Sequence, residues 1–475
     1  MKTGLYLSLL LLLLVSCKPA NQSAGPVGSS VSAGQTAFPE ADGYRGIWFT
    51  LGQFSEFGDK YSGGLGTYTA NHLPVAVYAE KVNKTFFLYG GTTRSDEKHL
   101  LIMASYYDHG QNRVPRPVVV HDKVGVDDPH DNATLTLDEE GYLWIFVSGR
   151  ARERPGFKYR SRKPYDITAF DRISEEEMTY AQPWYFPGKG FINFFTKYTK
   201  GRELYFETSR DGRTWREDRK LAGLGGHYQV TAVRGDKIGT FFNYHPGGNV
   251  DQRTNLYYIQ TEDLGETWTT VDGKPLALPL TDVQNPALVI DYQAQGLLQY
   301  HMDLNWDRYG HPVMLYLNSR HHQPGPAGGS REWKITKWNG TAWETYPVCT
   351  SDHNYDMGSL YIEKDLWRII GPTEAGPQAG QTGGEMTAWI SRDEGKSWQK
   401  ERQLTVGSPR NHAYARRPLH AKDPFYAFWA DGDPTQFSES HLYFGDSSGN
   451  YWALPYDMKE DFAVPQKRSW RVGKL

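Results

Sequence analysis

Residues 261–268 of the chain read TEDLGETW, and residues 391–398 repeat the same pattern as SRDEGKSW. A variant that is one residue shorter, SRDGRTW, occupies residues 209–215. In the shared pattern S/T-x-D-x-G-x-x-W, the Asp carboxylate can accept N–H bonds of a tight turn, the Gly can adopt a positive φ, and the Trp can pack on a sheet. The three boxes therefore predict turns between the outer strands of repeated β-sheets, and we interpret their residues as structural.

A longer repeat surrounds these boxes. In each copy a polar cluster precedes a short apolar strand, a turn with Gly or Asp, and a second strand rich in aromatic residues; residues 133–147 and 228–244 are two such hairpins. The copies begin roughly 50–70 residues apart, which fits propeller blades with long loops. The sequence therefore predicts an all-β fold, a seven-bladed β-propeller. The seven clusters are marked by His72, His130, Tyr180, His227, Asn285, His353 and His412.

The composition agrees with this fold and excludes several classes of protein. The chain has 475 residues, of which 14% are aromatic, with 49 Gly and 27 Pro. Its hydrophobic content of 39% is too high for a disordered chain and too low for a protein that spans a membrane many times. A net charge of −3 provides no basic field for nucleic acid, and 2 Cys cannot form a disulfide framework.

The N-terminus is interpreted as a targeting segment. Residues 5–15 are an apolar run that is too short to span a membrane but right for a secretory signal. The sequence LVSC at 14–17 resembles the lipobox of bacterial lipoproteins, although an ordinary signal peptide also fits. We expect a signal peptide at 1–16, lipidation of Cys17, a flexible Ser/Gly/Ala-rich tether at 17–40, and the propeller at 41–475.

This segment also predicts the location of the protein. Lys18, rather than Asp, follows the cysteine, which by resemblance favours sorting to the outer membrane. The protein is expected in the bacterial cell envelope, periplasmic or surface-facing, as a monomer that touches the membrane only through its lipid.

The polar clusters predict where chemistry occurs. All seven occupy the start of an innermost strand, so in a closed ring they converge around the central channel on one face. His227 and His245 flank the turn at 234–236 and are expected to face each other, and Arg253, in a Gly-rich loop, could bind an anionic group. The alternative is that these side chains only form hydrogen bonds between blades.

A metal site is a further expectation. Cys349 and His353 lie close together in sequence, and with a histidine such as His245 they could hold a structural zinc ion. Calcium is the other cation considered, and a buried free thiol is the alternative for Cys349.

Several stretches resemble the BNR-4 group, secreted bacterial proteins with neuraminidase-type repeats. The group includes propeller-type ulvan lyases, lyases that remove rhamnose from glucuronate in arabinogalactan side chains, and propeller α-L-rhamnosidases. The resemblance therefore implies a propeller that acts at a rhamnose–glucuronic acid linkage and binds an acidic, rhamnose-containing polysaccharide or oligosaccharide. The stretches that carry it are residues 44–48, 63–68, 226–229, 243–248 and 352–361.

The resemblance also implies catalytic residues. The ulvan lyases of the group have two histidines about twenty residues apart, then a tyrosine about fifty residues later, then an arginine one strand further along. Here His109, His130 and Tyr180 match the first three, and the arginine position falls on Lys197, with Arg202 as the other candidate. A lysine there departs from the pattern and puts the contact to the substrate carboxylate in doubt.

Three functions remain open at this point. The first is a lyase that needs no cofactor, in which Lys197 or Arg202 would neutralise the uronate. His109 or His130 would then remove the C5 proton, and Tyr180 would protonate the leaving oxygen. His227, Tyr228 and His245 would shape the uronate site. The second function is an α-L-rhamnosidase, with His72 as a candidate catalytic residue, and the third is a glycan-binding propeller without catalysis.

Overall fold

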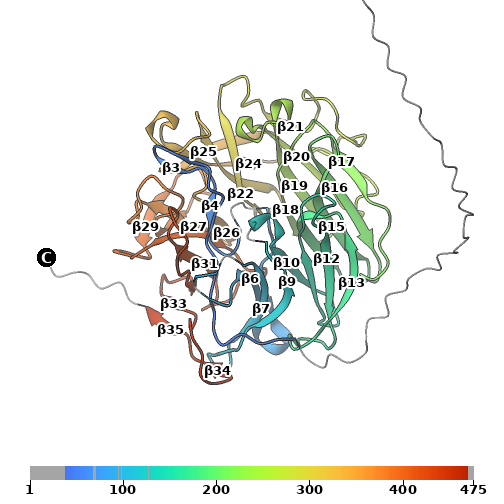
Figure 1. The fold of residues 1–475 in the computed structure, drawn as a ribbon. Coiled ribbons are helices and arrows are strands. Elements are labelled where there is room, and N and C mark those ends of the chain that lie inside the picture. The colour runs from blue at the N-terminus through green and yellow to red at the C-terminus, as the bar shows by residue number, and fades with distance from the viewer. Residues whose placement is uncertain (1–37, 68–70, 95, 98, 127, 469–475) are drawn as a thin grey trace, which may run out of the picture. The chain divides into compact units, whose positions relative to one another are not determined.

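Seven antiparallel sheets, six of four strands and one of five, surround a central axis in the computed structural model, which describes residues 38–67, 71–94, 96, 97, 99–126 and 128–468 (Figure 1). Within each sheet the strands pair in chain order from the innermost strand outward. The described residues contain no α-helix. The predicted all-β fold and seven-bladed propeller are confirmed.

Blades 1 to 4 come from the first part of the chain. Blade 1 is β5 (Ala76–Ala79), β6 (Lys84–Gly91), β7 (Leu101–Asp108) and β9 (Val118–Asp122). Blade 2 is β10 (Ala133–Leu137), β11 (Leu143–Val147), β12 (Gly156–Ser161) and β13 (Phe170–Glu176). Blade 3 is β14 (Thr179–Phe186), β15 (Gly190–Tyr198), β16 (Arg202–Ser209) and β17 (Arg219–Ala222). Blade 4 is β18 (Gln229–Arg234), β19 (Lys237–Tyr244), β20 (Thr254–Thr261) and β21 (Leu288–Ile290).

Blades 5 to 7 complete the ring. Blade 5 is β22 (Leu298–Trp306), β23 (Pro312–Ser319), β24 (Arg331–Trp338) and β25 (Trp343–Ser351). Blade 6 is β26 (Ser359–Glu363), β27 (Leu366–Glu374), β28 (Glu385–Ser391) and β29 (Gln399–Gln403). Blade 7 is β30 (Asn411–Arg416), β31 (Ala427–Gly432), β32 (Leu442–Gly445) and β33 (Tyr451–Ala453), and β35 (Gln466–Arg468) adds a fifth strand.

Short elements complete the described residues. Two small sheets pair β1 (Phe49–Thr50) with β4 (Ser62–Gly63) and β2 (Phe54–Ser55) with β3 (Gly58–Asp59). The 3-10 helices are η1 (Glu80–Val82), η2 (Pro129–Asp131), η3 (Pro246–Gly248), η4 (Val250–Gln252) and η5 (Pro326–Gly328).

One predicted blade start was wrong. The fifth repeat begins at β22, whereas Asn285 lies just before β21, the outermost strand of blade 4. The side chain and backbone of Asn285 form a turn there, in which the amide nitrogen donates to the Asp282 carbonyl at 2.7 Å and Oδ1 accepts from the Ala287 N–H at 2.8 Å. A turn of this kind carries the same polar residue types as a channel-facing cluster, which is why sequence alone confused the two.

The predicted box turns are confirmed, and they join the third and fourth strands of blades 3, 4 and 6. The Asp263 carboxylate accepts from the Thr267 N–H at 2.9 Å, and Gly265 has a φ of 82°. The Trp268 ring packs edge-on against Phe206 of the neighbouring blade with centroids 5.3 Å apart. These residues thus tie the outer rim of one blade to the next.

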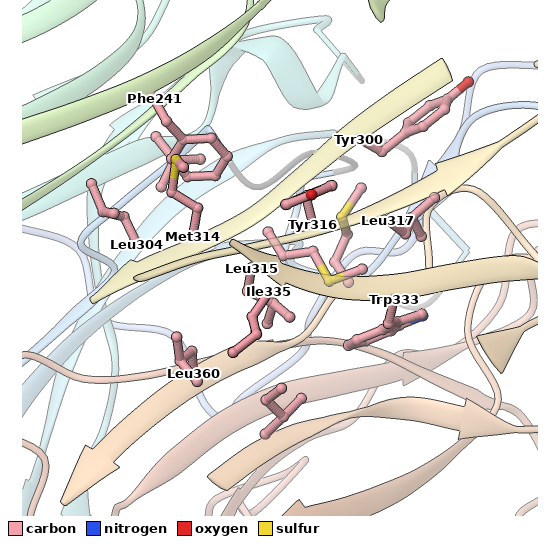
Figure 2. Packing of buried hydrophobic residues seen from close by; sticks show 14 of the residues in the cluster. Phe241, Tyr300, Leu304, Met314, Leu315, Tyr316, Leu317, Trp333, Ile335 and Leu360 are labelled. Atoms are coloured by element: carbon pink, nitrogen blue, oxygen red, sulfur yellow. The ribbon is translucent and has the colours of Figure 1, made fainter. Parts of the chain in front are cut away.

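The core lies between adjacent blades. Figure 2 shows this packing around blade 5, where Leu304, Leu315 and Ile335 lie close to Phe241 of blade 4 and Leu360 of blade 6. All five side chains are fully buried. Because each blade offers both faces to its neighbours, its strands carry apolar residues on both sides rather than strict alternation.

The ring closes through segments outside the blades. Gly46 bridges both Gly91 of blade 1 and Ser440 of blade 7. Near it, the Tyr44 N–H donates to the Pro455 carbonyl at 2.9 Å, and β34 (Phe462–Ala463) pairs with β8 (Val114–Pro115). The two ends of the described chain therefore fasten the last blade to the first.

Gly43 tests this closure. A Cβ atom at Gly43 would lie 2.0 Å from the Tyr456 carbonyl oxygen, and the residue has a φ of 154°. We expect Gly43→Ala to lower the free energy of unfolding by about 2–4 kcal/mol, measured by denaturant titration.

Gly52→Ala is the matched control, because Gly52 also has a positive φ, of 70°, but has nothing within 4 Å of its Cβ position. It should cost only about 1 kcal/mol. Equal losses in the two variants would mean that the contact to Tyr456 does not hold the seam.

Candidate active site

Aromatic and imidazole rings gather where the innermost strands begin. Every blade supplies one such residue within four residues of the start of its innermost strand, and all seven are buried. Neighbouring rings are in contact, for example Tyr180 with Tyr228 at 5.7 Å between centroids and Tyr300 with Tyr355 at 5.5 Å. We call this set the ring belt; it consists of His72, His130, Tyr180, Tyr228, Tyr300, Tyr355 and Tyr414.

Tyr180 is held in the belt by an unusual backbone. Its φ is 57°, in the left-handed region, and the pairing of β14 with β15 shifts register between Thr179 and Gln182. A β-bulge re-aims the side chain it carries, and a non-glycine residue in this region stores strain of roughly 1–3 kcal/mol. The ring lies between His72, with centroids 5.1 Å apart, and His130, 5.4 Å apart.

His130 is oriented by Asp128, a residue that the sequence analysis did not identify. The Asp128 carboxylate binds Nδ1 of His130 and also accepts from its backbone N–H at 3.0 Å. Arg150 and Arg154 contact the other carboxylate oxygen at 3.0 and 2.6 Å. Burial lowers the pKa of His130, and the Asp128 hydrogen bond opposes that shift. With Nδ1 donating to a carboxylate, Nε2 is the atom at which His130 can take up a proton.

His72 holds the backbone of His130 in place. Its Nε2 lies 3.2 Å from the His130 carbonyl oxygen, so Nε2 carries the proton, and Nδ1 accepts from the Thr67 hydroxyl at 3.0 Å. Burial lowers the pKa of His72 to about 3, so the ring is neutral. His72 is therefore placed to position His130 rather than to transfer a proton itself.

Arg253 occupies a cage of tyrosines. Its guanidinium carbon lies 4.8 Å from the centroid of Tyr228, 4.5 Å from that of Tyr300 and 5.5 Å from that of Tyr355. Within the described residues its one hydrogen bond runs from Nε to the Val250 carbonyl at 3.0 Å, and it forms no ion pair there. The side chain is buried. A buried cation without a carboxylate partner is well suited to bind an anionic ligand.

The structure separates the two candidates for the carboxylate contact. Lys197 points to the outer part of blade 3, where Nζ binds Asp218 at 2.8 Å and lies over the Tyr205 ring. Arg202 begins β16 after the tight turn that follows Tyr198, on the face where the ring belt lies, with its guanidinium carbon 5.6 Å from the Tyr198 centroid. Lys197 is therefore misplaced for this role, whereas Arg202 lies at the site.

His227 and His245 lie on opposite faces of their hairpin, so the expectation that they face each other was wrong. His227 uses both ring nitrogens for backbone contacts, to the Asn243 carbonyl at 2.8 Å and from the Leu224 N–H at 3.0 Å. His245 instead packs against Tyr228 with centroids 4.9 Å apart. Both of its ring nitrogens are buried and have no hydrogen-bond partner in the described part of the chain.

His109 does not join the site. It follows β7 and lies beside the turn that ends β5, whereas His72 precedes the start of β5 at the opposite end of blade 1. There its Nε2 contacts the Thr85 hydroxyl at 2.8 Å and its Nδ1 contacts the Asp423 carbonyl at 3.2 Å. The separation of 21 residues from His130 thus places the two histidines on different faces, and the assignment of His109 as catalytic is corrected.

The expected metal combination is also not formed. No group of three or more His, Cys, Asp or Glu side chains is placed to hold a metal ion in the residues that the structure describes. Cys349 lies in β25, an outermost strand, where burial raises the pKa of its thiol. His353 contacts the Asp59 carbonyl through Nε2 at 3.2 Å and the Thr382 hydroxyl through Nδ1 at 3.1 Å. His245, in blade 4, shares no contact with either.

These features define a class of protein: a seven-bladed propeller with a cationic, aromatic site at the centre of one face. The chain belongs to the BNR repeat-containing family, whose model matches residues 86–351. The predicted resemblance is confirmed.

Individual relatives are distant. The chain is 22% identical over 283 residues to an ulvan lyase of Alteromonas sp. (strain LOR), and 21% identical over 252 residues to an ulvan lyase of Pseudoalteromonas sp. (strain PLSV). These matches cover 52% and 46% of this chain. They span 57% and 51% of the relatives, about half of their length.

Solved structures agree on the fold over a longer stretch. A PL25 ulvan lyase superposes with a TM-score of 0.67 at 16% identity, covering 86% of this chain and 96% of that one. The same type of enzyme bound to -[GlcA(1-4)Rha3S]- gives a TM-score of 0.66 at 15% identity and covers 86% and 95% of the two chains. At these identities the likeness establishes the architecture.

Cys17, the expected signal segment and residues 17–37 of the expected tether lie outside the described residues, so lipidation stays a prediction. The end predicted for the tether is wrong by three residues, because the Phe38 N–H donates to the Thr168 carbonyl at 2.8 Å and Glu40 bridges Val118. Within the described ranges no helix is long and apolar enough to cross a membrane.

The buried histidines predict how stability depends on pH. Burial lowers the pKa of His353 to about 3, below the value of 6.5 expected in the unfolded chain. Below pH 6.5, His353 therefore binds a proton in the unfolded chain but not in the folded protein. The free energy of unfolding that this histidine contributes is lost as the pH falls below 6.5. The loss is about 2 kcal/mol at pH 5.

His353→Gln isolates this contribution. We expect the free energy of unfolding of the variant to lie below that of the wild type at pH 7.5, and the difference to shrink by about 2 kcal/mol at pH 5. Urea denaturation at both pH values measures it. A difference that stays constant with pH would contradict a neutral His353.

Proposed function

We propose that the protein is a polysaccharide lyase that cleaves a rhamnose-α-1,4-glucuronic acid linkage by β-elimination. The observation that carries this proposal is the buried guanidinium of Arg253, which has no ion-pair partner among the described residues and shares the Tyr228 ring with Tyr180. A uronate carboxylate supplies the missing anion. The ulvan lyases among the relatives, including the one bound to a glucuronate–rhamnose oligosaccharide, support the same substrate class.

The chemistry follows from the geometry of the site. The C5 proton of a uronate becomes more acidic when its carboxylate is neutralised, because the negative charge of the intermediate spreads onto that group. Arg253, with Arg202 beside the site, neutralises the carboxylate. His130 removes the C5 proton at Nε2 while Asp128 holds the ring. The C4–O4 bond then breaks as a C4=C5 double bond forms, and Tyr180 protonates the O4 oxygen, which leaves with the preceding sugar. This chemistry requires no cofactor.

The site favours this reaction over glycoside hydrolysis. A hydrolase needs two carboxyl groups flanking the bond, one as acid and one as base or nucleophile. Two carboxylates flank His130 at the belt, and both are already in ion pairs: Asp131 with Lys123 and Arg154, and Asp128 with His130, Arg150 and Arg154. Those contacts hold the pKa of Asp128 well below its usual range, even though burial alone would raise it. Such a group is a poor proton donor.

The activity is tested on two polymers. The purified mature protein is incubated with ulvan and with gum-arabic-type arabinogalactan, and ultraviolet absorbance and free rhamnose are followed together. We expect absorbance from the unsaturated uronate product. Rhamnose without absorbance would instead indicate a rhamnosidase, and tight binding without either product would indicate a glycan-binding propeller.

A pair of histidine variants serves as the control for this assay. His130→Ala should lower kcat by about 10²–10⁴-fold because it removes the base. His109→Ala removes a histidine on the other face and should change kcat less than about twofold, on the scale of a surface substitution. Similar losses in both variants would remove His130 from the mechanism.

Arg202 and Lys197 give a second matched pair. Arg202→Ala should lower kcat/KM by about 10²–10³-fold, the cost of losing one donor to a developing charge. Lys197→Ala breaks a half-buried ion pair to Asp218 and should change stability by less than about 1 kcal/mol with little effect on activity. If Lys197→Ala were the more damaging substitution, the carboxylate would be bound on the other side of blade 3.

We also propose that the mature protein is a monomer held at the bacterial envelope by lipid on Cys17. The apolar run and the LVSC sequence support this anchor.

A further inference from the structure

A cavity of about 570 Å³ lies over blades 5 and 6. Its walls come from the β2–β3 hairpin, from the loop that joins β23 to β24, and from the segments around residues 352 and 380. These loops connect strands at the end of each blade where the innermost strands begin, so the cavity opens on the same face as the ring belt.

Phe57 forms an aromatic wall of this cavity. Its side chain is 41% exposed although it is fixed from two sides. The ring packs so closely on Gly325 that a Cβ atom there would lie 2.3 Å from it. The side-chain amide of Gln381 clamps the hairpin, since Nε2 donates to the Phe57 carbonyl at 2.7 Å and Oε1 accepts from the Asp59 N–H at 3.2 Å. A rigid, half-exposed ring of this kind can stack on the C–H face of a sugar.

The charges of the cavity select an uncharged ring. Glu56 and Asp352 supply carboxyl groups, and burial raises the pKa of Asp352. Arg331 is the cationic side chain in the lining, but its guanidinium donates to the carbonyls of Gly325, Gly329 and Gln323 and to Asn354 Oδ1 at 2.6–3.0 Å. With its donors used in this way, the cavity offers no cation to a sulfate or a carboxylate.

Packed residues connect the wall of the cavity to the Arg253 cage. The Asp59 carbonyl, at the end of the hairpin, contacts His353 Nε2 at 3.2 Å. Two residues later Tyr61 packs on Tyr355 with centroids 5.3 Å apart, and Tyr355 is a wall of the cage around Arg253. The Phe57 hairpin is therefore held in a fixed position relative to the cage, and both lie on the same face of the propeller.

We propose that the cavity beside Phe57 is a second saccharide subsite, which binds an uncharged sugar ring of the polymer whose uronate is held at Arg253. The inference rests on the proposed function, since it takes the uronate to be bound at the cage. It implies that the enzyme binds internal stretches of a chain and prefers chains in which the ring at this position carries no sulfate.

The experiment compares Phe57→Ala with Phe54→Ala. Phe54 lies on the same hairpin and is 53% exposed, but it is absent from the cavity lining. Both variants are made in a His130→Ala background so that the ligand is not consumed, and calorimetry measures binding of chemically desulfated ulvan octasaccharides. We expect Phe57→Ala to weaken binding about tenfold and Phe54→Ala to leave it within about twofold, on the scale of a surface substitution.

Two further comparisons sharpen the result. Native sulfated octasaccharides should bind the His130→Ala protein with an unchanged hairpin more weakly than desulfated octasaccharides do. Adding Glu56→Gln should reduce this preference for the desulfated ligand. Equal affinities of the two phenylalanine variants, or a preference for the sulfated chain, would overturn the subsite. Thermal unfolding of each variant verifies that the hairpin substitution leaves the propeller folded.

The outcomes separate the subsite from the proposed function. If the wild type releases unsaturated product but Phe57→Ala binds octasaccharide normally, only the subsite is wrong. If no unsaturated product forms from either polymer, lyase activity is wrong, and a selective loss of binding in Phe57→Ala would still support the subsite.

Discussion

A ring of seven sheets needs its last blade fastened to its first, and this constraint determines where everything else in the molecule lies. Here no blade is shared between the two ends of the chain, since the strands of each blade come from one continuous stretch of sequence. The fastening falls instead on the segment around Gly46, which bridges blades 1 and 7 at once. Once the ring is closed, seven innermost strands start around one axis, and the side chains at those starts converge on that axis.

The centre that results is unusual in its electrostatics. A guanidinium in a protein interior normally has a carboxylate partner, because burying an unpaired charge is costly. Around Arg253 that part is taken by the faces of Tyr228, Tyr300 and Tyr355, whose π-systems attract a cation without neutralising it. The aromatic residues that make the composition so rich in tyrosine therefore do more than fill a core. The three tyrosines hold the guanidinium of Arg253 in place, and in the proposed function the uronate of the substrate supplies the negative charge opposite it.

Much of the architecture could be predicted because its signals are local. The box turns and the hairpins at 133–147 and 228–244 each depend on residues within about a dozen positions, so one sequence suffices to recognise them. The start of blade 5 was missed because Asn285, a turn residue, carries the same polar chemistry as a channel residue. Tyr300, which blade 5 contributes to the belt, was the available signal for that blade.

The site was harder to predict because it depends on which end and which face of a strand a residue occupies. His109 and His130 have the spacing of the resembling family, yet His109 lies at the end of blade 1 opposite the belt. Lys197 pairs with Glu203, whereas Arg202 pairs with Tyr198, so alternation along the strands places Lys197 and Arg202 on opposite faces of the same hairpin end. Asp128 belongs to no motif that the sequence analysis recognised. Its contact to His130 depends on its place as the N-cap of the short helix η2, which the sequence analysis did not predict.

The histidines of the centre have a consequence for how the protein works across environments. His72, His227 and His301 each use both ring nitrogens, and burial lowers the pKa of all three to about 3 or 4. Neutral imidazoles thus supply the hydrogen bonds, while the positive charge belongs to arginines, which keep it at any physiological pH. In the proposed reaction, the arginines that would bind the uronate and the histidine that would move the proton are therefore different groups. Binding of the polymer should then persist at an acidic pH at which proton transfer has already failed.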